Sequence, residues 1–274
     1  MTCVVNRVLQ KLSHSKCSSL IPSQESHPGY ETGSWNYIKL GTWYQNQHFE
    51  WNTHSAGNAL VFGPPGSGKS HVQYTVIQHC LSYPEQWELR GISITANDLV
   101  SYMAGDVSAE HVTTNLEDSV ALLRGLKAVM LERYDRINQA DGTLHIKDGV
   151  KRIMVVIDEV SDLINPVPAE DGVEEILLKE EASQLLSELT GHARAAGINF
   201  MAGGVTPLSH MSGEMRNNFF PVISMGDYAP HSDYTPTGPL DSPPELLPPS
   251  KVTGRGCITT HLGASIFQAY LAKN

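Results

Sequence analysis

Residues 63–70 read Gly-Pro-Pro-Gly-Ser-Gly-Lys-Ser and match the phosphate-binding pattern G-x-x-x-x-G-K-[ST] in full. In such a loop the glycines let backbone N–H groups converge on phosphate oxygens, and the helix that follows presents the positive end of its dipole. Lys69 is expected to reach the β- and γ-phosphates, and the Ser70 hydroxyl to bind Mg²⁺. The loop therefore predicts binding of ATP or a related nucleoside triphosphate.

The predicted nucleotide contacts run through the whole loop and into the residue after it. They are Gly63, Pro64, Pro65, Gly66, Ser67, Gly68, Lys69, Ser70 and His71. The surrounding sequence supports this prediction, because the apolar run 59–62 fits a buried parallel strand and residues 71–83 carry apolar side chains close to helical period. A strand before the loop and a helix after it are the context that such a loop requires.

A pair of carboxylates forms the second candidate part of the site. Asp158 and Glu159 directly follow the apolar run 153–157, which is the strongest strand pattern in the chain. The carboxyl end of a parallel strand faces the phosphates, so Asp158 is expected to hold Mg²⁺ through water. Glu159 is then placed to orient or deprotonate the attacking water. Lys69 and Glu159 are therefore the predicted catalytic residues of an ATPase.

The elements that must position these residues alternate along the chain. Strands are expected at 59–62, 91–95, 153–157 and 198–202, and helices at 71–83, 115–138 and 173–196. This alternation predicts an α/β fold of the RecA-like P-loop NTPase type, with a mainly parallel sheet flanked by helices on both faces. Asn115 is the predicted cap of the second helix, and Gly197 is expected to stop the third. A hairpin is predicted at 35–51 and another at 256–271.

Length and composition indicate one globular domain. The chain has 274 residues, of which 41% are hydrophobic and 18% charged. Residues 1–34 are rich in Ser, His and Pro and are expected to form a poorly ordered extension, whereas 35–274 form the ATPase domain. The proline-rich stretch 228–250 is a predicted loop within that domain.

Charge, apolar runs and cysteines bear on nucleic-acid binding, on membrane insertion and on the compartment of the protein. The net charge is −10 and the pI about 5.6, which argues against tight non-specific nucleic-acid binding by the isolated chain. DNA stays open as a partner, because a ring-shaped motor needs only a local basic stripe. No run approaches the ~18 apolar residues of a membrane span, so no membrane insertion is expected. The scattered cysteines Cys3, Cys17, Cys80 and Cys257 suggest free thiols in the cytoplasm of a bacterium or an infected host.

Several segments between residues 38 and 271 resemble the motor domain of the FtsK and SpoIIIE family of DNA translocases, within the FtsK-HerA class. The matching segments are 60–70, Met-Leu-Glu-Arg-Tyr at 130–134, Val-Ile-Asp-Glu-Val-Ser-Asp-Leu-Ile at 156–164, Arg-Ala-Ala-Gly-Ile-Asn at 194–199, Gly-Arg-Gly at 254–256 and Phe-Gln-Ala-Tyr at 267–270. Each short motif is weak alone, but their order and spacing together are specific.

The resemblance implies a homo-oligomer, a hexameric ring around double-stranded DNA with ATP sites at the subunit boundaries. It also implies that Arg194 reaches a neighbour's γ-phosphate as a trans-acting finger, which makes Arg194 the third predicted catalytic residue. The alternative is that Arg194 is an ordinary positive charge favoured at the C-terminus of a helix.

One position departs from the family pattern. Val205 stands where the family usually has a glutamine that senses the γ-phosphate, and Thr206 where an arginine follows it. Valine can neither donate nor accept a hydrogen bond through its side chain. We expect one of three consequences: slower hydrolysis, altered coupling of hydrolysis to movement, or replacement of the sensor by Thr206. Binding of ATP is unaffected by this change.

The first functional hypothesis is an ATP-dependent motor that translocates double-stranded DNA during DNA transfer or packaging. The lack of a membrane-spanning start and of a winged-helix tail favours a phage- or plasmid-encoded protein. The alternatives are an ATPase module like those of type VII secretion, which act on proteins, and an ATP-binding regulator with weak turnover. The acidic charge and Val205 favour the secretion-like module slightly.

Overall fold

The computed structural model describes residues 35–43, 47–95, 99, 103, 111–140, 149–167, 172–205, 211–226, 253–260 and 263–271. The predicted N-terminal extension 1–34, the proline-rich loop 228–250 and Thr206 lie outside the described residues. Among the helices that the structure describes, none combines the length and apolar character that a bilayer crossing requires.

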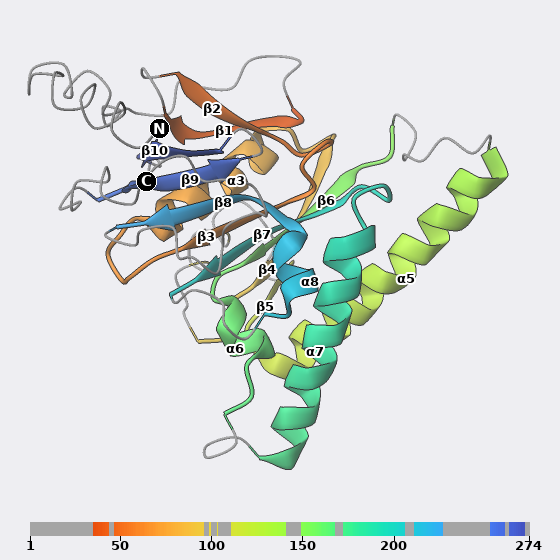
Figure 1. Ribbon diagram of the computed structural model, residues 1–274. Helices are drawn as coiled ribbons and strands as arrows, with labels where there is room; N and C mark the ends of the chain where they lie inside the picture. Colours follow the sequence, from red (N-terminus) through yellow and green to blue (C-terminus); the bar gives the residue numbers. More distant parts are fainter. Residues whose placement is uncertain are drawn as a thin grey trace, which may run out of the picture.

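A ten-stranded sheet forms the centre of the molecule (Figure 1), in the order β2-β1-β10-β9-β8-β3-β7-β6-β4-β5. The strands are β1 Tyr37–Thr42, β2 His48–Asn52, β3 Asn58–Phe62, β4 Trp87–Ile92, β5 Val112–Thr113, β6 Arg152–Ile157, β7 Ile198–Gly204, β8 Phe219–Met225, β9 Arg255–Thr260 and β10 Gly263–Ala269. All pairings from β8 to β5 are parallel, and those from β2 to β8 are antiparallel. The predicted α/β fold is confirmed, with a mixed sheet in which both predicted hairpins extend the parallel half.

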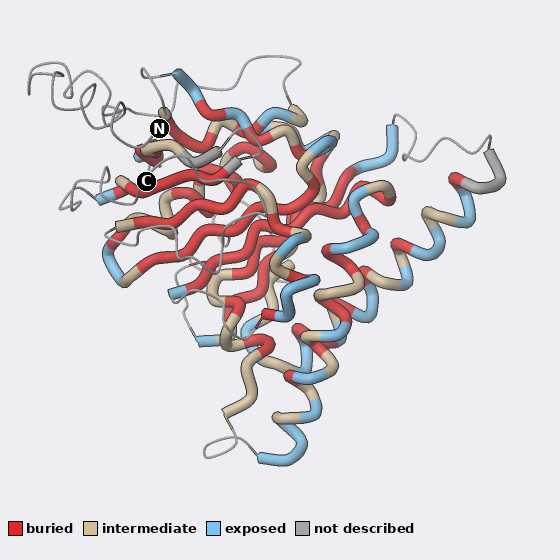
Figure 2. The backbone as a smooth tube through the Cα atoms, viewed as in Figure 1, coloured by how far each residue is buried: buried red, intermediate tan, exposed pale blue. Residues whose placement is uncertain are grey.

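Helices cover both faces of the parallel half. They are α3 Lys69–Ser82, α5 Leu116–Ala140, α6 Val160–Ile164, α7 Val173–His192 and α8 Gly213–Asn217. Alternate residues of β6 point to opposite layers: Val155 packs in the core under α5, α6 and α7, whereas Val156 packs in the core under α3. Figure 2 shows the central strands buried along almost their whole length, as expected for parallel strands with two covered faces.

Asn115 caps the start of α5 as predicted, whereas α7 ends at His192 and not at the predicted residue 196, because a turn intervenes before Gly197. The Asn115 side-chain oxygen accepts a hydrogen bond from the Asp118 N–H at 2.8 Å, which satisfies one of the free donors at the start of α5. Regular helix α7 ends at His192, and residues 193–197 form a turn that is closed by bonds from Gly197 N to Arg194 O and from Ile198 N to Ala193 O. Gly197 adopts a φ of 73°, which a glycine reaches without steric cost.

Two sequence-based predictions of strands need correction. The strand predicted at 91–95 is β4, Trp87–Ile92, because the alternating side chains Trp87 and Leu89 pack in the core and the chain leaves β6 after Ile92. Strand β8 was not predicted at all. Its interior Pro221 has no N–H to donate, and two residues of β8 lie opposite one residue of β3 at that point. Proline inside a strand occurs at such bulges and weakens the sequence signal.

Candidate functional site

The loop that follows β3 turns back across the carboxyl end of the sheet, and its glycines make the turn possible. Gly63, Gly66 and Gly68 have φ angles of 153°, 75° and 107°, which residues with a side chain rarely adopt. A Cβ on Gly63 would lie 2.6 Å from the Met225 carbonyl oxygen, and a Cβ on Gly68 would lie 2.7 Å from the Gly254 backbone. The three glycines are therefore required by conformation and, at Gly63 and Gly68, by close packing.

The start of α3 and the loop residues before it present groups suited to a phosphate. Gly68 is the N-cap residue of α3 and supplies no side-chain cap, so the first N–H groups of the helix carry no side-chain acceptor. The Ser67 hydroxyl is buried without a hydrogen-bond partner in the described part of the chain. The Lys69 ammonium group donates to the carbonyl oxygens of Gly63 at 2.7 Å and of Pro64 at 3.3 Å. The Ser67 hydroxyl and the N–H groups at the start of α3 are donors that bound phosphate oxygens would satisfy.

The two carboxylates follow β6, separated from β3 in the sheet only by β7. The Ser93 hydroxyl, at the end of β4, donates to Asp158 Oδ2 at 3.2 Å and orients that carboxylate. Burial lowers the pKa of Lys69, and the negative charges of Glu159 and Asp158 act in the opposite direction. The structure therefore brings Lys69, Asp158 and Glu159 together, although they come from distant parts of the sequence.

Glu159 is partly buried and lies at the carboxyl ends of β6 and β7. One of its oxygens, Oε1, accepts hydrogen bonds from the Ser161 hydroxyl at 2.5 Å and from the Val205 N–H at 3.2 Å. Burial raises the pKa of Glu159, while the bonds from Ser161 and Val205 and the charge of Lys69 lower it. The carboxylate has a shifted pKa and defined donors, as expected of a group that takes part in proton transfer.

A metal ion at this site would have few protein ligands. Within the described residues there is no group of three or more His, Cys, Asp or Glu side chains that could hold a metal. Mg²⁺ keeps several water molecules and typically binds through one or two protein oxygens together with substrate phosphates. One hydroxyl, from Ser70, and one carboxylate, from Asp158, fit that kind of binding.

Contacts from the C-terminal strands support the loop from outside and were missed by the sequence-based reasoning. The Gly254 N–H donates to the Ser67 carbonyl oxygen at 2.8 Å, and Gly226, after β8, lies beside Pro64. Gly226 and Gly254 have positive φ angles of 77° and 84°. The Gly-Arg-Gly segment at 254–256 was visible in the sequence, but nothing in it specified contact with residues so far away.

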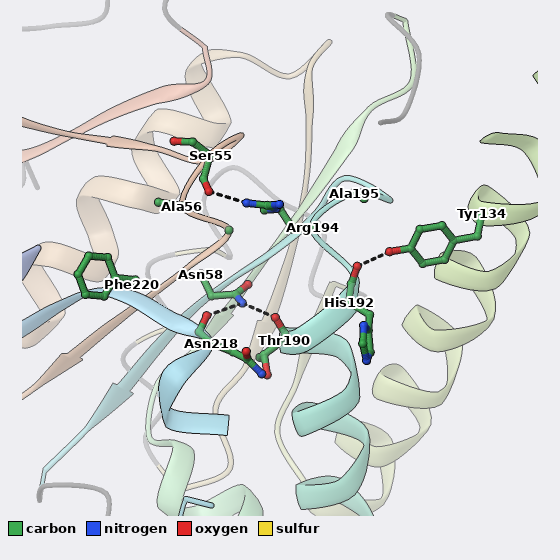
Figure 3. A pocket seen from close by; sticks show the side chains of 12 residues that line it. Ser55, Ala56, Asn58, Tyr134, Thr190, His192, Arg194, Ala195, Asn218 and Phe220 are labelled. Carbon is green, nitrogen blue, oxygen red and sulfur yellow. Dashed lines mark hydrogen bonds between the residues drawn. The ribbon is translucent and has the colours of Figure 1, made fainter. Parts of the chain in front are cut away.

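Arg194 does not join this group of residues. Its guanidinium donates to the Ser55 carbonyl oxygen at 2.7 Å (Figure 3). Its side chain also packs over Gly57, just before β3. The loop follows the other end of β3, and the five residues of this strand span roughly 17 Å at about 3.3 Å per residue. Arg194 therefore lies at the opposite end of the strand from Lys69 of the same chain.

A pocket of about 450 Å³ surrounds Arg194 at this amino end of the parallel strands. In the view of Figure 3, Tyr134 donates to the carbonyl oxygen of His192, and Asn58 donates to those of Thr190 and Asn218. The bonds to His192 and Thr190 satisfy carbonyl groups at the end of α7 and tie this helix to α5 through Tyr134 and to β3 through Asn58. The pocket is thus a junction of several elements, remote from the candidate nucleotide site.

Comparison with solved structures identifies relatives of the same fold. The conjugation coupling protein TcpA of pCW3, in its monomer form with ATPγS, has a TM-score of 0.79 and 20% identity, over 93% of this chain and 72% of that one. The EssC ATPases 2 and 3 from Geobacillus thermodenitrificans have a TM-score of 0.70 and 18% identity, over 93% of this chain and 48% of theirs. The cytoplasmic domain of the Thermomonospora curvata type VII secretion ATPase EccC has a TM-score of 0.65 and 16% identity, over 93% and 28%.

This chain spans less than half the length of the matched EssC and EccC chains. At these identities the structural likeness shows the fold alone, which is that of P-loop ATPases. No curated protein sequence matches the chain significantly.

The family assignment comes from the sequence profile. The model of the FtsK/SpoIIIE family matches residues 20–167, which is more than half of the chain and includes both the loop at 63–70 and the carboxylates at 158–159. Membership implies nucleotide binding and supports ATPase activity. The chain belongs to the FtsK/SpoIIIE family.

Proposed function

We propose that this chain is an ATP-hydrolysing motor domain that moves double-stranded DNA, in DNA transfer or packaging. The observation that carries the proposal is the convergence of Lys69, Asp158 and Glu159 at the carboxyl end of β3 and β6, in a chain of the FtsK/SpoIIIE family. The loop, the lysine and two strand-end carboxylates are the parts that a P-loop ATPase uses.

In this proposal each residue has a separate role. Backbone N–H groups of the loop at 63–70, in which Pro64 and Pro65 have none, bind the phosphates, with His71 continuing the contact. Lys69 leaves its loop carbonyls to bind the β- and γ-phosphates. Ser70 and Asp158 hold Mg²⁺, which neutralises charge on the phosphates when bound. Glu159 orients the attacking water and accepts its proton.

The proposed cargo is DNA, and the proposed assembly is a hexameric ring. The named function of the pCW3 coupling protein, conjugation, supports DNA transfer as the process. Since the chain carries a net charge of −10, contact with DNA would depend on a local basic surface exposed to the channel of the ring. The position of Arg194, far from Lys69 of its own chain, is compatible with contact with a neighbour's nucleotide and not with its own.

A second candidate is an ATPase module that acts on protein substrates. It is favoured by the match to EssC and EccC, which cover 93% of this chain, and by the acidic charge. In that case turnover would respond to a protein partner and be indifferent to DNA.

The test is the ATPase rate of the purified chain with and without long linear double-stranded DNA. Stimulation of several-fold is the expected result; a rate that ignores DNA would refute the DNA motor and favour the protein-directed module. Binding of ATPγS without any turnover would indicate a regulator.

Two substitutions test the residue roles. Lys69→Ala should abolish nucleotide binding, whereas Glu159→Gln should bind ATP and stop turnover. Lys127→Ala is the control, because that lysine pairs with Glu188 between α5 and α7, outside the site. Full activity of Glu159→Gln would show that Glu159 is not the base.

A further inference from the structure

The Glu159 carboxylate is held unequally at its two oxygens. The Ser161 hydroxyl and the Val205 N–H both donate to Oε1, at 2.5 Å and 3.2 Å. Among the described residues none donates to Oε2. A carboxylate fixed at one oxygen cannot rotate freely, so its second oxygen keeps a defined direction.

The backbone brings the two donors to this carboxylate for separate reasons. Glu159 is the extended N-cap residue of α6, with φ −130° and ψ 104°, and Ser161 follows two residues later in the first turn of that helix. Val205 directly follows β7, which pairs with β6. The two strand ends approach closely at Gly203, where a Cβ would lie 2.2 Å from the Asp158 carbonyl oxygen. Gly203 thus permits the approach that puts the Val205 N–H beside Glu159.

We propose that Ser161 is a positioning residue, which together with the Val205 backbone N–H fixes Glu159 Oε1 and leaves Oε2 to face the attacking water. The proposal rests on the proposed function, because it gives Glu159 the role of base in ATP hydrolysis. Orientation of a catalytic group in advance of reaction is a general source of rate acceleration.

The contact between Val205 and Glu159 does not depend on the side chain of Val205. The valine side chain cannot bind phosphate or water, but the contact with Glu159 is made by the main chain. A backbone donor is present whatever the side chain, provided that the residue is not proline. The end of β7 therefore stays linked to the catalytic carboxylate without the glutamine that is usual in the family.

Other charged groups also act on the Glu159 carboxylate. The Asp162 charge, on the same helix α6, repels the carboxylate, whereas the Lys69 ammonium, on α3, attracts it; Asp158, at the end of β6, also acts on Lys69. Asp162 itself is held by the Thr95 hydroxyl, a contact that does not involve Glu159.

The experiment compares Ser161→Ala with Ser161→Thr, and uses Thr95→Ala as the matched loss of a hydroxyl from a neighbouring carboxylate. In the nucleotide-free protein, hydrogen exchange of the Val205 amide is followed by NMR, with Glu159→Ala as the variant that lacks the acceptor. Ser161→Ala should exchange this amide about tenfold faster, because its acceptor is no longer fixed, and Ser161→Thr and Thr95→Ala should match the unmodified protein.

Steady-state kinetics and binding of ATPγS complete the test. Ser161→Ala should lower kcat about tenfold, with KM and ATPγS affinity within twofold, and Ser161→Thr should restore kcat. Unchanged exchange of the Val205 amide in Ser161→Ala, or a loss of kcat that threonine does not restore, would overturn the proposal. If the unmodified protein had no ATPase activity, the proposed function would fail, while the exchange experiment would still decide whether Ser161 orients Glu159.

Discussion

Support of the phosphate-binding loop by the C-terminal strands leads to a quantitative prediction for Gly254→Ala. Gly254 has a φ of 84°, where a residue with a Cβ costs about 1–2 kcal/mol relative to glycine. Its new Cβ would also lie 2.8 Å from the amide nitrogen of Gln268, a fully buried side chain that binds the Thr253 carbonyl. The local backbone is therefore expected to move, and the bond from Gly254 N to Ser67 O to weaken.

Gly149→Ala is the matched control. Gly149 has a φ of 91°, and a Cβ there would meet no atom of the described residues within 4 Å. Both variants should lose about 1–2 kcal/mol of unfolding free energy from backbone strain. Only Gly254→Ala should also weaken ATPγS binding, by up to about tenfold, which corresponds to ~1.4 kcal/mol.

The assays are urea unfolding and calorimetric titration with ATPγS. The two variants separate a general loss of stability from an effect transmitted to the loop. If Gly254→Ala bound ATPγS as tightly as Gly149→Ala, the inferred support of the loop by the C-terminal strands would be refuted.

Two further predictions concern stability. Asn58→Ala would remove three hydrogen bonds of a buried side chain, with the carbonyl oxygens of Thr190 and Asn218 and with the N–H of Phe200. We expect urea unfolding to show a loss of about 3–5 kcal/mol of unfolding free energy. A loss below about 1 kcal/mol would contradict the role of Asn58 as the link between β3, α7 and the start of β8. Burial lowers the pKa of His79 to about 4, and the unfolded chain, with an ordinary value near ~6.5, binds the proton more readily below that pH. The unfolding free energy is therefore independent of His79 above the unfolded pKa and falls as the pH is lowered from there towards 4. Between pH 7 and 5 the protein should lose about 2 kcal/mol more of its unfolding free energy than His79→Gln, measured by urea unfolding at each pH. Equal losses in the two proteins would contradict burial of a neutral imidazole.

The parts of the site that the sequence predicted are those encoded over a few residues. The loop at 63–70 needs its glycines for their φ angles and is followed at once by its helix, so its conformation is a local property. Asn115 caps α5 through the N–H three residues later, and the turn after α7 closes at Gly197 through bonds between residues three and five positions apart. Such features are readable because the interacting groups are close in the chain.

The sequence-based predictions are wrong or incomplete where contacts between distant segments determine the structure. The bounds of β4 depend on its pairing with β6, and β8 contains a proline that is tolerated only because a bulge forms opposite β3. The contact of Ser67 with Gly254 and that of Glu159 with Val205 join segments from different strands of the sheet. Neither contact has a local sequence pattern, because a backbone N–H is present in almost every residue.

The sequence by itself determined that this protein has a phosphate-binding loop, a pair of strand-end carboxylates and an α/β order of elements, since residue type and short spacing specify all three. Only the tertiary structure decided which groups surround Glu159, what supports the loop, and that Arg194 lies at the other end of β3. The physical reason is the sheet order, which puts β3, β7 and β6 side by side although long stretches of chain separate them. Strand pairing and close packing at Gly203 and Gly254 then fix distances that no local preference determines.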